Sequence, residues 1–287
     1  NTFDMRTSYL LCVAWLCLGY SSLNGQATFN LRMHFDTPAT YLTSIVCTDS
    51  CYYATGIYAD TFPWLQVGSV FAKINLDGTI AYTRKLIHPD KSYETRMNTL
   101  TSLEDGNFVA TAYSFDPEMK GMLIKYSPHG DTVWTKEYLN PFHPIQHFCA
   151  PITLQVLENE GLAMACWIQK NAGNGETYLL KTDSQGNVQQ QILYSNALWD
   201  RPYSTLLTPS GELIVGAARS NISWVNEGYT FQNHIFQIDA LGNTQWTYLS
   251  PVSEGLRYGA ADMVLLEDGS LVVASGIGYE QQRSSVN

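Results

Sequence analysis

Two hairpin patterns alternate along the chain, and this alternation constrains the fold more than any other feature. The first pattern is an apolar strand, a polar turn that ends in glycine, and a second strand; it recurs at 70–86, 121–138, 178–194 and 235–249. The second is a short turn such as Asp-Gly between two apolar strands; it recurs at 42–56, 99–114, 152–167, 205–220 and 263–276. Glycine accepts the positive φ that such turns require, so both patterns predict β-hairpins.

The turn glycines give the length of the repeat. In the first pattern the intervals are 52, 56 and 56 residues, between Gly78, Gly130, Gly186 and Gly242. In the second they are 55, 50 and 58 residues, between Gly106, Gly161, Gly211 and Gly269. Two interleaved series with one period define a four-stranded unit of about 55 residues, which is typical of a β-propeller blade. A parallel β-helix has a much shorter period and a sandwich does not repeat so regularly, so we predict an all-β fold of the β-propeller class.

The repeat also predicts the blades and their strand order. Complete blades span 41–86, 97–139, 152–195 and 204–250, and a partial blade spans 261–276, within a propeller domain of 27–287. The second hairpin pattern should supply the inner strands, because they are almost entirely apolar or small. The strand 29–35 is predicted to be an outermost strand that completes the last blade. That blade lacks part of its outer pair, so we expect the sequence to be a piece of a longer chain.

The first residues have the layout of a signal peptide. Arg6 provides a cationic start, 9–19 (YLLCVAWLCLG) is an apolar run too short to span a bilayer, and small or polar residues follow. We predict a signal peptide within 1–25, after upstream residues 1–4, with cleavage following Gly25; a buried N-terminal helix is the alternative. The signal predicts a secreted or cell-surface protein without a membrane span after cleavage.

Four of the six cysteines remain after removal of the signal peptide. Cys47 and Cys51 flank a hairpin turn, and Cys149 and Cys166 lie near the two arms of another hairpin. An even number of cysteines in an exported chain favours disulfides, so we predict a bridge within each pair. A metal site is the alternative for the first pair, but no second ligand pair accompanies it at zinc spacing, and we predict no metal.

The strand residues resemble those of secreted β-propellers of Bacteroidota. The resemblance covers about 29–276 and rests on repeated positions: Lys73, Asp105, Gly106, Lys125, Trp134, Lys181, Trp246, Asp268 and Gly269. It implies the propeller fold, and it suggests cargo of type IX secretion, although no sorting domain of that route is present in the sequence. It implies no particular activity. The turn 239–246 (DALGNTQW) also resembles the repeats of quinoprotein propellers, but 183–190 lacks the tryptophan and no cofactor pattern follows, so we predict no cofactor.

Candidate binding residues lie in the loops that join blades and in the loops after the second strand of each blade, which emerge on one face around the channel mouth of a propeller. Three arginines precede the inner turns: Arg96 and Arg201 by ten residues and Arg257 by twelve. Guanidinium groups at equivalent blade positions suit a carboxylate or phosphate ligand. The alternative is that each arginine pairs with a local acid, such as Glu94, Asp200 or Asp262. The aromatic candidates are Trp64, Trp199, Trp224 and Tyr258.

Two further constellations are weaker. His143 and His147 have the spacing of a helical metal pair, but Pro144 lies between them. Asp116 and Glu118 resemble an acid–base pair, yet such carboxylates on a loop are more often solvated.

The favoured function is a secreted, non-enzymatic binding or adhesion module. The alternative is an extracellular hydrolase or lyase that acts on polysaccharide at the channel face, and a quinone-dependent dehydrogenase is a third possibility. A net charge of −10 lacks the basic footprint that nucleic acid requires. We therefore expect a monomer whose partner is a carbohydrate or an extracellular protein.

Overall fold

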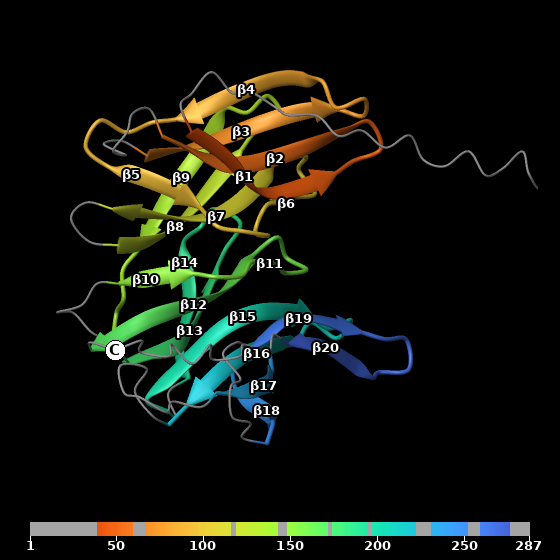
Figure 1. The fold of residues 1–287 in the computed structure, drawn as a ribbon. Coiled ribbons are helices and arrows are strands. Elements are labelled where there is room, and N and C mark those ends of the chain that lie inside the picture. Colours follow the sequence, from red (N-terminus) through yellow and green to blue (C-terminus); the bar gives the residue numbers. More distant parts are fainter. Residues whose placement is uncertain are drawn as a thin grey trace, which may run out of the picture.

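The computed structural model describes residues 39–59, 67–115, 119–142, 148–171, 174–194, 197–221, 231–251 and 259–275, and every element in these ranges is a β-strand (Figure 1). The first blade contains β1 (Ala39–Cys47), β2 (Cys51–Ala59), β3 (Val67–Asn75) and β4 (Ile80–Leu86). The second contains β5 (Ser92–Thr95), β6 (Thr101–Ser102), β7 (Phe108–Phe115), β8 (Met119–Tyr126) and β9 (Thr132–Tyr138).

The remaining strands repeat this arrangement. The third blade contains β10 (Cys149–Pro151), β11 (Gln155–Val156), β12 (Leu162–Asn171), β13 (Asn174–Thr182) and β14 (Val188–Tyr194). The fourth contains β15 (Trp199–Leu207), β16 (Leu213–Ser220), β17 (Gln232–Ile238) and β18 (Thr244–Leu249). A final hairpin consists of β19 (Ala260–Leu265) and β20 (Leu271–Ser275).

The strands of each blade pair with their sequence neighbours in antiparallel order, as in β1-β2-β3-β4. In the second and third blades the first strand is interrupted, so β5 and β6 both pair with β7, and β10 and β11 both pair with β12. Figure 1 shows the sheets following one another from β1–β4 at the top to β15–β20 at the bottom. The predicted fold class, a β-propeller of four-stranded blades with one partial blade, is confirmed.

Eight hairpin turns of the described residues share one geometry. In the turn before β7, Gly106 N–H donates to the carbonyl of Leu103, and Leu103 N–H donates to the carbonyl of Asn107. This is a three-residue loop whose last residue has positive φ, and glycine fills that place in seven turns. The third blade differs from the prediction: Glu160 has the positive φ of 58°, and Gly161 follows it. Gly161 is therefore not the turn residue, because ENEG is offset by one residue from the pattern LEDG.

Hydrogen bonds and close contacts join the outer strands of neighbouring blades. Tyr138 Oη donates to the carbonyl of Gly186 in the next blade at 2.7 Å, and Tyr194 Oη donates to the carbonyl of Gly242 at 2.7 Å. A Cβ on Gly186 would lie 2.9 Å from the side chain of Lys136, and one on Gly242 would lie 1.7 Å from that of Ile192. These glycines are thus required for positive φ and for close approach between blades.

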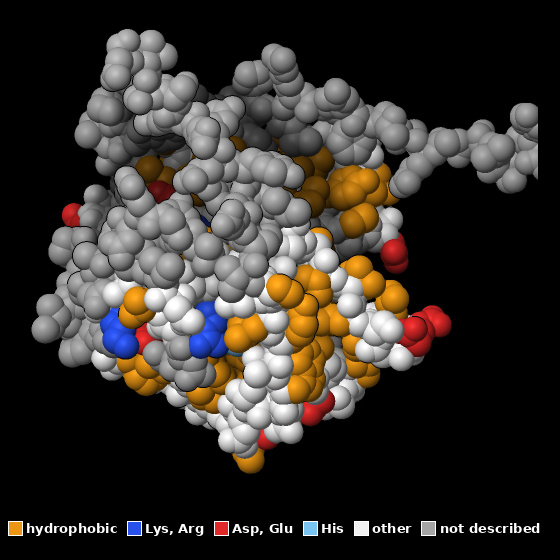
Figure 2. All heavy atoms as spheres, turned by 60° about the horizontal axis from the view of Figure 1, so that its bottom comes forward, with side chains coloured by type: hydrophobic (Ala, Val, Ile, Leu, Met, Phe, Trp, Pro, Cys, Tyr) orange, Lys and Arg blue, Asp and Glu red, His pale blue; other side chains and the backbone are white. Residues whose placement is uncertain are grey.

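Burial falls from the inner strands to the outer ones. Seven of the eight residues of β16 are buried, because blades cover both faces of this strand. On β18 all six residues are exposed, Trp246 by 39% and Tyr248 by 51%. Figure 2 turns this lower part of the molecule forward and shows hydrophobic side chains at its surface. Trp134, at the position of Trp246 in the second blade, instead packs against the core between sheets.

The described residues include no helix long and apolar enough to cross a membrane. The predicted signal peptide within 1–25 and the predicted strand 29–35 lie outside the described residues.

Candidate functional site

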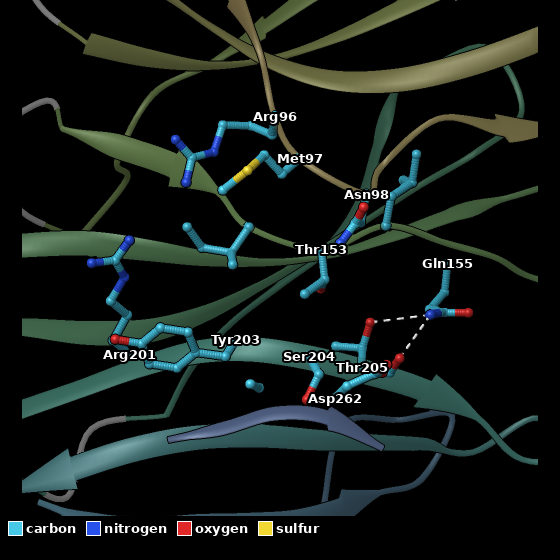
Figure 3. Close-up of a pocket in the computed structure, with 13 residues that line it drawn as sticks. Arg96, Met97, Asn98, Thr153, Gln155, Arg201, Tyr203, Ser204, Thr205 and Asp262 are labelled. Carbon is cyan, nitrogen blue, oxygen red and sulfur yellow. Dashed lines mark hydrogen bonds between the residues drawn. The ribbon is translucent and has the colours of Figure 1, made fainter. Parts of the chain in front are cut away.

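The first strands of consecutive blades enclose a cavity of about 530 Å³ (Figure 3). Its walls come from the residues around β5, β10, β11, β15 and β19, so the first strands of these blades line one cavity. Besides two arginines, the polar lining comprises Asn98, Thr153, Gln155, Ser204, Thr205 and Asp262. A cavity of this size falls in the range of small-molecule sites.

Arg201, on β15, is held between two aromatic rings. Its guanidinium carbon lies 5.4 Å from the ring centroid of Trp167 and 5.3 Å from that of Tyr203. Both distances are within the range of cation–π attraction. The Nε atom of Arg201 is buried and has no hydrogen-bond partner among the described residues. The two rings therefore restrict the position of the guanidinium group, and its Nε–H remains without an acceptor among the described residues.

Arg96 follows β5 and has a similar environment. Its guanidinium carbon lies 5.3 Å from the ring centroid of Tyr113, and its Nε atom is also buried without a partner in the described part of the chain. The hydroxyl of Tyr113 donates to the carboxylate of Glu94. Burial, followed by the proximity of Glu94, raises the pKa of Tyr113 to about 12. Arg96 acts on the same hydroxyl in the opposite direction, lowering its pKa, so Glu94 and Arg96 share Tyr113 as a partner.

The acids expected to neutralise the arginines have other partners. Asp200 is buried, accepts from Thr177 Oγ1 at 3.2 Å and lies 2.8 Å from His234 Nδ1. Asp262 Oδ1 accepts the backbone N–H of Met263 at 2.8 Å. Within the described ranges no ion pair joins Arg96 or Arg201 to a carboxylate, and Arg96 shares Tyr113 with Glu94.

Sequence reasoning placed Arg96 and Arg201 in one site, and both line this cavity. The structure places Trp199 elsewhere: it is 7% exposed and packs on Phe231 with a centroid distance of 4.7 Å. Its ring is part of a hydrophobic cluster and is not at the cavity surface. The other predicted residues lie outside the described residues; they are Trp64, Trp224, Arg257 and Tyr258. The weaker constellations at 116–118 and 143–147 lie outside them too.

The aromatic supports of the arginines were not predicted from sequence. Tyr113 and Trp167 each follow a positive-φ turn residue by seven positions, after Gly106 and Glu160 respectively. This shared offset was a usable signal, but the one-residue error at the third turn concealed it.

All four described cysteines are free thiols, so the predicted bridges are not present. Cys47 lies opposite Tyr52, and side chains alternate between faces, so Cys51 projects from the other face of the sheet. Cys149 lies opposite Ile168 and Cys166 opposite Pro151, which makes the two cysteines diagonal neighbours. Diagonal Cα atoms are about 7–8 Å apart, beyond the usual disulfide span. Burial, together with the neighbouring Cys149 to which it is hydrogen-bonded, raises the pKa of the Cys166 thiol well above its ordinary value.

In the described part of the chain, no group of three His, Cys, Asp or Glu side chains is arranged to hold a metal ion.

No family model matches the sequence, and no curated protein matches it. Among solved structures, a protein of unknown function from Bacteroides caccae is 14% identical with a TM-score of 0.51, and the match covers 85% of this chain and 74% of that one. An endo-arabinase from Bacteroides thetaiotaomicron is 12% identical with a TM-score of 0.47, covering 82% and 90%. A mannose phosphorylase from Leishmania mexicana is 10% identical with a TM-score of 0.46, covering 94% and 91%. At such identities a likeness concerns the fold alone. Fold and cavity together define a β-propeller with a polar cavity at its centre.

Proposed function

We propose that the protein is a ligand-binding β-propeller that takes a carbohydrate into its central cavity. The observation that carries this proposal is the cavity itself, with amide and hydroxyl side chains contributed by several consecutive blades. Its volume of about 530 Å³ suits a small polar ligand better than a folded protein partner. Carbohydrate is therefore favoured over the extracellular protein that the sequence left open.

Some polar groups of the lining hold the blades together, and others remain available. Gln155 Nε2 donates to the carbonyl of Thr205 at 2.9 Å (Figure 3), and Ser204 Oγ donates to the carbonyl of Ala260 at 2.7 Å. The side-chain amide of Asn98 makes no hydrogen bond to a described residue and lines the same cavity. Asn98 is thus the neutral side chain best suited to meet a sugar hydroxyl.

Cleavage of a polysaccharide is the second candidate, and the observation that favours it is the carboxylate of Asp262 in the lining. Glycoside hydrolysis ordinarily uses two carboxyl groups, one on each side of the scissile bond. Asp262 is the one carboxylate among the described lining residues, so a hydrolase would draw its second group from outside them. Binding of a carbohydrate requires no second carboxylate.

Titration calorimetry of the purified chain against neutral and acidic oligosaccharides tests the proposal. We expect a saturable complex that is weakened by Asn98→Ala and unaffected by Asn243→Ala, an exposed turn residue of the outer hairpin. Absence of binding to every sugar would reject the carbohydrate proposal. Release of shorter products during incubation would replace binding with cleavage as the function.

We also propose export from the cell, on the strength of the cationic start and the apolar run 9–19. Expression of the full sequence with its native N-terminus, followed by mass determination of protein in the medium, tests this. Intact protein retained with the cells would contradict it.

A further inference from the structure

The cavity contains two arginine side chains that form no ion pair with a carboxylate of the described residues. We propose that Arg96 and Arg201 together bind the carboxylate of an acidic sugar, which makes the ligand a uronate-type saccharide. This inference rests on the proposed function and adds the chemical class of the ligand. It begins from the buried Nε atoms of both arginines, which lack hydrogen-bond partners.

A buried guanidinium nitrogen without a partner is costly, and proteins normally satisfy such groups. Here the neighbouring acids are already occupied, Glu94 by Tyr113 and Asp200 by His234. A carboxylate that enters the cavity would supply the missing acceptors. The binding would replace two unsatisfied donors with charge-assisted hydrogen bonds, which are stronger than neutral ones.

The aromatic contacts prepare both guanidinium groups for this role. The ring of Tyr113 lies against Arg96, and the rings of Trp167 and Tyr203 lie against Arg201. A ring that stacks on a guanidinium occupies its face and leaves the N–H groups at its edge free for a planar oxyanion. The side chains are thus ordered before the ligand arrives, which reduces the entropy cost of binding.

The repeat brings the two arginines to one ligand. Each precedes the positive-φ residue of its inner turn by ten positions, and both line the cavity although their registers differ: Arg201 lies opposite Ala218, whereas Arg96 N–H donates to the carbonyl of Thr111. The equivalent residue of the third blade, between them, is Ala150, which leaves room. In Figure 3 both guanidinium groups lie on the same side of the cavity.

The charge of the lining agrees with this assignment. Two arginines face one carboxylate, that of Asp262, among the described lining residues. An acidic chain with a net charge of −10 therefore carries a locally positive cavity, which concentrates anions against the overall field.

Calorimetry of the full chain with oligogalacturonate, with its neutral methyl ester and with inorganic phosphate tests the inference. We expect oligogalacturonate to bind at least about tenfold more tightly than the ester, and more weakly as salt increases. Arg96→Gln and Arg201→Gln should each reduce its affinity about tenfold or more. Arg84→Gln is the matched control, because Arg84 also stacks on a tyrosine, 5.4 Å from the ring centroid of Tyr82, but is exposed on β4.

Each outcome is decisive once circular dichroism shows that the variants are folded. Equal binding of the ester, unchanged by either cavity substitution, would overturn the carboxylate inference and leave the carbohydrate proposal standing. Phosphate binding as tight as that of oligogalacturonate would overturn the assignment to an acidic sugar, because the site would then select charge alone. No binding of any saccharide would reject the proposed function itself.

Discussion

The turn at Glu160 provides a direct test of the repeat. This residue has a φ of 58°, where the other inner turns with positive φ have glycine at Gly106, Gly211 and Gly269. Its carboxylate makes no hydrogen bond or ion pair with a described residue. Glu160→Gly therefore changes the backbone preference of the turn without removing a side-chain contact.

The expected change in the free energy of unfolding is the difference between two opposing contributions. A residue with a Cβ pays roughly 1–2 kcal/mol to adopt the left-handed conformation, and glycine does not. Glycine also increases the conformational entropy of the unfolded chain, which costs about 0.4–1 kcal/mol. Glu160→Gly should therefore raise the free energy of unfolding by roughly 0.5–1 kcal/mol. Urea denaturation measures this as a higher midpoint at an unchanged m-value.

Gly106→Ala and Gly211→Ala are the reverse experiments. A Cβ at either position meets no heavy atom within 4 Å, so each substitution introduces backbone strain alone. Both should lower stability by roughly the amount that Glu160→Gly adds. Gly186→Ala should cost more, because its Cβ would also lie 3.1 Å from Trp134. A stability loss in Glu160→Gly, or no loss in the two alanine variants, would refute the reasoning.

Three further predictions concern packing, acid stability and thiols. Tyr138→Phe should cost about 0.5–1.5 kcal/mol in urea unfolding, since it removes the bond to Gly186, whereas Tyr248→Phe at the exposed edge should cost nothing; equal effects would contradict this. Burial opposes ionisation of Asp105, but hydrogen bonds from Lys125 and Asn107 outweigh it and lower the pKa of Asp105 below 3.8. Its stabilisation is complete above about pH 4 and lost as the pH falls through the lowered pKa, so the stabilities of wild type and Asp105→Asn should converge there; parallel curves would contradict the linkage. Among the four described cysteines, exposed Cys47 should react first with a thiol reagent, while Cys51, Cys149 and Cys166 should wait for unfolding; fast labelling of all four would contradict their burial.

The blade architecture could be predicted from sequence because every hairpin carries its own signal. A turn glycine and an alternating or continuous apolar strand are local properties, and their period reports the architecture. The inner turn of the third blade could not be placed, because ENEG puts glycine one residue beyond the position that needs it and Glu160 takes the positive φ. The disulfide prediction was wrong for a similar reason. Sequence spacing indicates which cysteines lie near each other, but the strand register decides whether their side chains can meet.

Only some residues of the candidate site could be predicted from the sequence. Arg96 and Arg201 precede their turn residues by the same number of positions, and both line one cavity although their strand registers differ. Trp199, two residues before Arg201, lies on the same face of β15, but its ring meets Phe231 in a hydrophobic cluster and is not part of the cavity lining. The partners of the acids, such as His234 with Asp200, come from other strands and have no local signature.

One of the two rings that support Arg201, that of Trp167, comes from a different blade, and this makes a sharp prediction. The residue of the fourth blade equivalent to Tyr113 and Trp167 is Ala218, so Arg201 stacks on Trp167 of the third blade. If Trp167 acts by positioning Arg201, Trp167→Leu should weaken binding of an acidic sugar severalfold and leave its neutral ester unaffected.

A double-mutant cycle separates positioning from general damage. Trp167→Leu should add no further loss to Arg201→Gln, because the ring then has no guanidinium to hold. Trp134→Leu is the matched control: its indole nitrogen is also buried without a hydrogen-bond partner, but its ring packs against the core cluster between blades. Additive losses in the double mutant, or an equal loss in Trp134→Leu, would show that Trp167 contributes only stability. A non-additive result would mean that Arg201 of the fourth blade is positioned for binding only when the third blade, which carries Trp167, packs beside it.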